Sequence, residues 1–255
     1  MEIDLEKAKE RFLEYTEIYD LDNENIKRKQ VHSLRVMKIS EKIAKSINLS
    51  EQEVKVATLI GLLHDIARFE QYTKYHTYND LDSIDHGDLG VQILEKDLRN
   101  YIETDKYDNI IKEAIKNHNK YQISEEITDK ENLFAKIIRD ADKIDILYQS
   151  IEKFGTVKKE KIKKLKISED AVEEFKKLKS IRNKKEQQIE NDIEVLIKVI
   201  ALIFDINFKI SFQILKERDN INKILCNCEF KNENTKKLME EVRNIANTYI
   251  EEKTK

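Results

Sequence analysis

Hydrophobic side chains recur every three or four residues along most of the chain, which is the period of one helix face. This pattern predicts helices over residues 4–20, 32–47, 50–64, 107–118, 132–149 and 234–252, and another that starts between 83 and 87 and ends near 98. Residues 189–215 are strongly apolar and are expected to form a buried helix pair. Residues 71–83 have no clear period, so we expect a loop there.

Residues that interrupt helices are scarce in this sequence. The 255 residues include no proline and only four glycines, whereas strands joined by tight hairpins usually need glycine turns. Ser50 and Glu53 have the spacing of a capping box at the start of one expected helix. We therefore predict an all-α fold, with a helical core over residues 1–150 and a C-terminal helical elaboration packed on it over residues 151–255.

Charge and segment composition narrow the range of partners and locations. The net charge of -3 predicts no general attraction to nucleic acid or to an acidic membrane surface. The basic run at residues 158–166 gives way to mixed charges, which favours a solvated helix face over a nucleic-acid surface. No stretch approaches the roughly 18 apolar residues of a membrane span, and the acidic start does not resemble a signal peptide. We expect Cys226 and Cys228 to be free thiols and the protein to be cytoplasmic.

Four polar side chains continue apolar helix faces that should point inward, namely His32, His64, His118 and Asp142. A lone histidine on an apolar face is usually a satisfied core residue, but four helices with this feature indicate a shared site. Asp65 follows His64 directly, and burial of an unpaired carboxylate costs several kcal/mol, so something must neutralise it. That partner is either a metal ion or an ordinary hydrogen-bonding group near the surface.

The types of side chain in this set favour the metal. Imidazole is a good ligand for Zn, Fe, Ni and Cu, and carboxylate also suits Mn and Mg. A mixed set of histidine and aspartate therefore suits a divalent ion that holds a reactive water.

The order of these residues resembles the HD superfamily of metal-dependent phosphohydrolases. The matching residues are His32 in VHSLRV, His64 and Asp65 in LLHDIARF, and Asp142 in IIRDADKID. The ADK context resembles the closing pattern of the family, and it selects Asp142 over Asp140 and Asp145. The resemblance covers roughly residues 25–150 and implies an all-α HD-domain helical bundle. The usual HDIG motif reads HDIA here, which is a small change on a helix.

Two further histidines, His86 in SIDHGDLG and His118 in IKNHNK, give an order that resembles the branch of the superfamily with two metals. The resemblance implies that Asp65 bridges the ions and is the central catalytic residue. It implies one ion held by His32, His64 and Asp142, and another held by His86 and His118.

Other interpretations stay open for some of these histidines. His86 could cap a helix or line a cleft, and His118 could contact phosphate beside a single metal. His76 has no counterpart in the pattern, and we expect it to be a loop residue. The expected cofactor is one or two divalent ions, drawn from Mn, Fe, Mg, Zn, Co and Ni.

Positive side chains near the proposed ligands are candidates for balancing the charge of a phosphorylated substrate. By position they are Arg35, Arg68 and Lys143. A surface charge or a structural ion pair is the alternative for each. Three tyrosines, Tyr72, Tyr75 and Tyr78, either stack on a base as a lid or pack on the domain.

The leading hypothesis is a metal-dependent phosphohydrolase that cleaves a phosphomonoester or nucleotide by a metal-activated water. One alternative is a phosphodiesterase of a cyclic or signalling nucleotide. Another is a non-catalytic protein that binds metal or nucleotide for regulation, and a helical scaffold is a fourth. The expected partner is a small phosphorylated substrate, with no membrane and no nucleic acid. The apolar residues 195–215 are buried within the chain or in a homodimer, and the sequence leaves both open.

Overall fold

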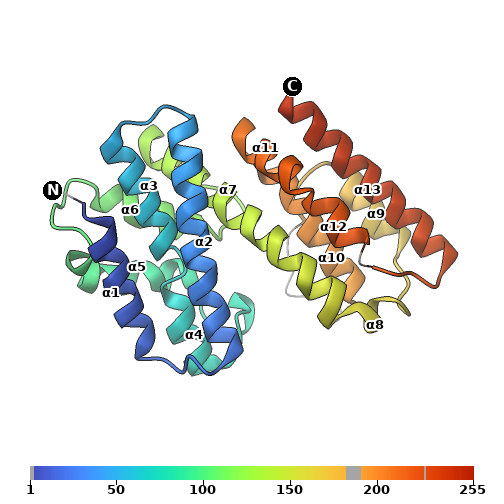
Figure 1. The fold of residues 1–255 in the computed structure, drawn as a ribbon, viewed down its shortest axis with the longest axis horizontal. Coiled ribbons are helices and arrows are strands. Elements are labelled where there is room, and N and C mark those ends of the chain that lie inside the picture. Colours follow the sequence, from blue (N-terminus) through green and yellow to red (C-terminus); the bar gives the residue numbers. More distant parts are fainter. Residues whose placement is uncertain (1–2, 182–190, 227) are drawn as a thin grey trace. The chain divides into compact units, whose positions relative to one another are not determined.

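The computed structural model describes residues 3–181, 191–226 and 228–255. Within these ranges the chain is helical and has no strand, which confirms the all-α prediction (Figure 1). The chain divides into two compact units, Met1–Asp142 and Lys143–Lys255. The division that we expected at residue 150 stays a prediction. No helix in the described ranges combines the length and the apolar character that a membrane span requires.

The first unit holds the helices that carry the candidate site. Its elements are α1 (Leu5–Glu17), α2 (Glu24–Ser46), α3 (Glu51–Leu63), α4 (Ala67–Tyr75), η1 (Asp80–Asp82), α5 (His86–Asp97), η2 (Leu98–Asn100), α6 (Asp108–Asn117) and the first part of α7 (Asp129–Glu152). Its main packing is α2 against α3, and α5 packs against both α4 and α6. The apolar stripes predicted from the sequence form the core, with Val36, Ile60 and Ile111 almost fully buried.

Side-chain caps fix where several of these helices begin. The capping box at Ser50 and Glu53 is confirmed, because each side chain bonds the other residue's backbone N–H. Asp4 caps α1 and Asp85 caps α5 through bonds to the N–H groups of the first turn. The start of α5 matters most for function, because its first residue is His86.

The loop expected over residues 71–83 is wrong in its first part. Helix α4 continues through residues 71–75 and ends where His76 adopts a left-handed conformation with φ of 55°. The apolar period disappears there because the buried side chain of this stretch is polar: Gln71 is fully buried and is held by hydrogen bonds to Asp80 and Ser83. A polar side chain that is satisfied inside the domain gives no hydrophobic signal in the sequence.

Over its described residues, the second unit is built from the rest of α7 and eight further segments. These are η3 (Lys153–Val157), α8 (Lys159–Ile162), α9 (Glu169–Lys176), α10 (Asp192–Ile200), η4 (Ala201–Asp205), α11 (Lys209–Arg218), α12 (Asn220–Cys226) and α13 (Glu233–Thr254). The expected closing helix is confirmed as α13. The expected pair over residues 189–215 has two buried helices in its described part, but α10 packs on α9 and η4, and α11 packs mainly on α13. Residues 189 and 190 lie outside the described ranges.

Lysines of the basic run at residues 158–166 form ion pairs within the second unit. Lys158 and Lys161 pair with Asp192, and Lys159 and Lys163 pair with Glu229. These contacts neutralise much of the run and do not favour a nucleic-acid surface. The two cysteines are free, as expected, with Cys226 exposed and Cys228 half-buried.

Candidate metal centre

The six predicted metal ligands come together in the first unit. His32 lies in α2, His64 ends α3, Asp65 follows it, His86 begins α5, His118 ends α6 and Asp142 lies in α7. Five of them are at most 4% exposed, and the side chain of Asp142 is 17% exposed. Residues from five helices or helix ends thus place nitrogen and oxygen atoms in one buried cluster.

One group of donors consists of His32, His64 and Asp142. The Nε2 atoms of the two histidines are 3.2 Å apart, and Asp142 Oδ1 lies 3.1 Å from His32 Nε2 and 3.7 Å from His64 Nε2. These three atoms lie close enough to one another to share a single ion.

A second group consists of His86 and His118, whose Nε2 atoms are 3.0 Å apart. Asp65 lies between the two groups. Its Oδ2 is 3.4 Å from His32 Nε2 and 3.6 Å from His64 Nε2, whereas its Oδ1 is 3.5 Å from His86 Nε2 and 3.7 Å from His118 Nε2. Each carboxylate oxygen therefore faces one pair of histidines, which is the arrangement that a bridging ligand needs.

The hydrogen bonds of the histidines show which ring nitrogens carry lone pairs. The Nδ1 atom of His64 lies 2.9 Å from the carbonyl oxygen of Gly61, and that of His118 lies 2.6 Å from the carbonyl oxygen of Ile115. A carbonyl oxygen only accepts, so each Nδ1 donates and each neutral ring presents its Nε2 lone pair to the cluster. A lone pair held about 3 Å from another ring nitrogen needs a proton or a metal cation between the two atoms, and the donor set fits divalent metal ions.

The pKa shifts of the cluster favour the protonation states that bind metals. Burial lowers the pKa of His64 and lowers that of His86 to about 3, so both imidazoles are neutral near pH 7. Burial alone would raise the pKa of Asp65, but the positive charges of Lys29 and Arg68 and the nearby histidines outweigh it. The pKa of Asp65 therefore lies well below its usual value, as does that of Asp142 beside His32 and His64. Neutral imidazole and ionised carboxylate are the ligand forms.

Two of the four glycines allow the helices to approach at this cluster. A Cβ atom on Gly61 of α3 would lie 2.9 Å from the Cα of Met37 and 2.6 Å from the Oγ of Ser40, both in α2. A Cβ atom on Gly87 of α5 would lie 2.9 Å from the carbonyl oxygen of Lys116 in α6. The first close approach sits beside the His32 and His64 pair, and the second sits beside the His86 and His118 pair.

The three predicted substrate-binding cations lie in different surroundings. Arg68 is next to the cluster, with its Nε 3.3 Å from Asp65 Oδ1 and its Nη1 3.0 Å from Asp80 Oδ1. Arg35 is half-buried in α2. Lys143 belongs to the second unit, where its ammonium is 2.8 Å from Asp205 Oδ2. A role of each in substrate binding stays a prediction.

The three tyrosines around the end of α4 do not form a uniform lid. Tyr72 and Tyr78 stack on each other with ring centroids 4.7 Å apart, and both hydroxyl groups bond to Asn25. Tyr75 is 46% exposed. This packing favours the interpretation in which the tyrosines pack on the domain. Tyr72 and Tyr78 already cover each other's ring faces, so those faces are not open to a base.

Several residues that contact the cluster were missed from the sequence. Lys29 donates to Asp65 Oδ2 at 2.7 Å, and Asp80 accepts from His86 Nδ1 at 2.5 Å. Arg139 is buried and donates to the backbone carbonyls of Asn117 and His118, which braces the end of α6. Lys29 precedes His32 by one helical turn, so its position on the same face was a usable signal. Asp80 lies in a segment without a hydrophobic period, so no sequence signal pointed to it.

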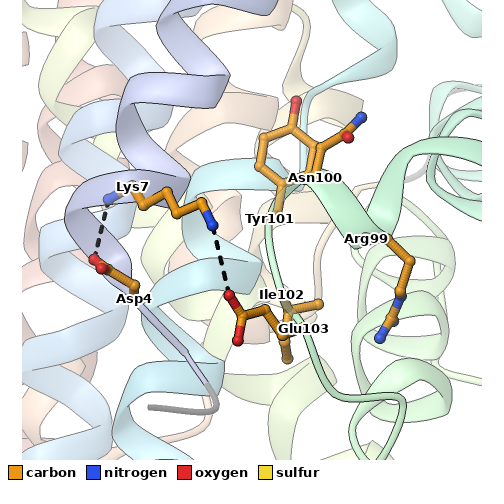
Figure 2. Close-up of a pocket in the computed structure, with 7 residues that line it drawn as sticks. All are labelled: Asp4, Lys7, Arg99, Asn100, Tyr101, Ile102 and Glu103. Carbon is orange, nitrogen blue, oxygen red and sulfur yellow. Dashed lines mark hydrogen bonds and ion pairs between the residues drawn. The ribbon is translucent and has the colours of Figure 1, made fainter.

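A small pocket elsewhere in the first unit shares no residue with this cluster (Figure 2). Its lining includes Lys7, whose ammonium is 3.5 Å from Glu103 Oε1, together with Arg99 and Tyr101. The side chains of Lys7 and Glu103 are largely exposed, so this pocket offers none of the buried donors that the histidine cluster provides.

Comparison with known proteins agrees with the geometry. The family model of the HD domain matches residues 30–147, a range that includes all six clustered residues. No curated protein and no solved structure matches the chain. HD domains are helical, bind divalent metals and are generally found in metal-dependent hydrolases. Residues 30–147, a little under half of the chain, therefore match the HD domain.

Proposed function

We propose that this protein is a metal-dependent phosphohydrolase that acts on a phosphomonoester or a nucleotide. The observation that carries the proposal is the position of Asp65, whose two oxygens each face a pair of histidine Nε2 atoms at 3.4–3.7 Å. In this proposal His32, His64 and Asp142 hold one divalent ion, His86 and His118 hold a second, and Asp65 is shared. Bound divalent ions supply an activated water and offset the charge of phosphoryl oxygens.

The protein's own groups have two tasks around this centre. Burial of the histidines keeps bulk water from competing for their lone pairs, and it keeps the rings of His64 and His86 neutral near pH 7. Lys29 and Arg68 place two positive charges beside Asp65, with side chains 18% and 12% exposed. These cations are suited to orient an anionic substrate at the edge of the site, since they lie within reach of solvent and of the shared carboxylate.

The alternatives to this proposal are an enzyme with a different substrate, a protein that binds its ligand without catalysis, and a structural scaffold. A phosphodiesterase of a cyclic or signalling nucleotide would use the same ligands, so only a comparison of substrates separates the two activities. A regulatory metal- or nucleotide-binding protein would bind ions without turnover. A helical scaffold would function without His64 or Asp65. A homodimer and a cytoplasmic location are also proposals.

The experiment combines metal analysis with a substrate panel. Protein purified without chelator or affinity metal is analysed for ions per chain, before and after reconstitution with Mn(II) or Fe(II). Reconstituted protein is then assayed on nitrophenyl phosphate, bis-nitrophenyl phosphate, nucleoside monophosphates and cyclic nucleotides. His64→Ala and Asp65→Asn should abolish turnover. His76→Ala is the matched control, because His76 is exposed and lies outside the cluster. Absence of bound metal under both conditions would contradict the catalytic proposal.

A further inference from the structure

Asp80 is the centre of a hydrogen-bond network between α4 and α5. Its Oδ2 accepts from His86 Nδ1 at 2.5 Å and from Asn119 Nδ2 at 3.1 Å. Its Oδ1 accepts from Arg68 Nη1 at 3.0 Å and from Gln71 Nε2 at 2.9 Å. Four donors therefore hold one carboxylate at a fixed distance from the His86 ring.

His86 needs such a partner because of its place in the fold. His64 and His118 end their helices, and each donates its Nδ1 proton to a carbonyl three residues earlier in its own helix. His86 is the first residue of α5, so no turn of its helix precedes it. Its tautomer must be set by a side chain from outside the helix.

Two side chains compete for the Nδ1 atom of His86. The carboxylate of Asp80 can only accept, which puts the proton on Nδ1 and leaves the lone pair on Nε2. The amide of Asn119 lies 3.2 Å from the same Nδ1 as a donor, which would put the proton on Nε2 instead. The amide cannot reverse its orientation without setting its oxygen against Asp80 and the Oδ1 of Asp85, which lies 3.0 Å from its nitrogen.

We propose that Asp80 is a positioning residue: its carboxylate selects the His86 tautomer whose Nε2 faces Asp65 and His118, and it thereby creates the second metal position. The inference rests on the two-ion centre of the proposed function. Without the carboxylate, Asn119 is the remaining partner of Nδ1, and the Nε2 proton then blocks metal binding. Loss of Asp80 should convert a two-ion centre into a one-ion centre.

The effect should be confined to the second position. The donors of the first position come from α2, the end of α3 and α7. The groups that contact Asp80 come from α4, the start of α5 and the segment after α6. Arg68 is the link between the positions, because it contacts both Asp80 and Asp65.

The test compares Asp80→Leu, whose side chain has a similar size but accepts no hydrogen bond, with Asp85→Asn. Asp85 makes the same type of bond to Asn119 and caps α5, and asparagine also serves as a cap, but the bonds of Asp85 do not include the His86 ring. Full-length protein is reconstituted with Mn(II), and the ions per chain are measured. We expect two ions in the wild type and in Asp85→Asn, and one in Asp80→Leu and in His86→Ala. Nitrogen-15 spectra of the metal-free proteins report the tautomer of His86 directly.

The outcomes separate this inference from the proposed function. Two ions in Asp80→Leu with unchanged affinity would overturn the inference. A proton on Nε2 of His86 in the metal-free wild type would also overturn it, and this measurement needs no variant to fold. Fewer than two ions in the wild type would overturn the two-ion function and the metal consequence drawn from it, while the spectra would still decide what Asp80 does to the ring.

Discussion

Substitution of Gly61 by alanine should force α2 and α3 apart beside the candidate metal centre. The new Cβ atom would lie 2.9 Å from the Cα of Met37 and 2.6 Å from the Oγ of Ser40. The serine hydroxyl can rotate away, but the Cα atom is backbone, so the helices themselves must shift. Overpacking of this kind costs about 1–3 kcal/mol, and the better helix propensity of alanine returns about 1 kcal/mol. The difference is a net loss of about 0–2 kcal/mol, and because a backbone atom is involved we expect the upper part of this net range, about 1–2 kcal/mol.

Gly90→Ala provides the matched control for this substitution. Gly90 is also helical, but its Cβ would meet the Cγ2 atom of Ile115 at 3.2 Å, and a side-chain methyl can move by a few tenths of an ångström. Urea unfolding of both variants, each free of metal, gives the two changes in free energy of unfolding. Gly61→Ala should be the less stable by at least about 1 kcal/mol, and it should bind Mn(II) more weakly than Gly90→Ala does. Equal stability of the two variants would refute the steric argument.

Three further predictions concern charge and exposure. Lys29→Met leaves Asp65 with one positive neighbour fewer, so the free energy of unfolding of the metal-free variant should fall by about 1–3 kcal/mol, and Mn(II) should reduce that loss. The same loss with and without metal in urea titrations would contradict this. Burial raises the pKa of Cys228 to about 11, so iodoacetamide at pH 8 should label the exposed Cys226 first, and equal labelling rates in a peptide map would count against it. The capping-box bonds lower the pKa of Glu53 from 4.5 to about 2, so their stabilisation is complete above pH 4.5 and disappears as the pH falls towards 2. Glu53→Gln should flatten this part of the pH profile of unfolding, and an unchanged profile would disprove the prediction.

The inward faces of the helices were predictable because burial requires a regular period. His32, His64 and His118 continue apolar stripes, and a side chain on such a face must point into the domain whatever its chemistry. The sequence therefore indicated which polar residues would be buried. The distances among them depend on how closely the helices approach, and that approach depends on contacts such as Gly61 with Met37, which no local pattern encodes.

The residues that support the ligands were harder to predict. Asp80 acts through a ring six positions later in the chain, and it lies in a segment where Gln71 is buried through hydrogen bonds and not through apolar contact. Lys29 lies one helical turn before His32 on the same face, so the same pattern places it near the site. Its charge, however, gives no hydrophobic signal on that face. Polar networks depend on three-dimensional proximity, so sequence periodicity reveals their members only when they share a helix face.

The close helix contacts at Gly61 and Gly87 have a mechanical consequence for the cluster. Each contact sets the smallest spacing of one histidine pair, and the two contacts involve different helices, α2 with α3 and α5 with α6. The pairs are joined by the carboxylate of Asp65, whose two oxygens face one pair each. The two contacts therefore act on different histidine pairs, and a single methyl group added at Gly61 should disturb the His32 and His64 pair more than the His86 and His118 pair.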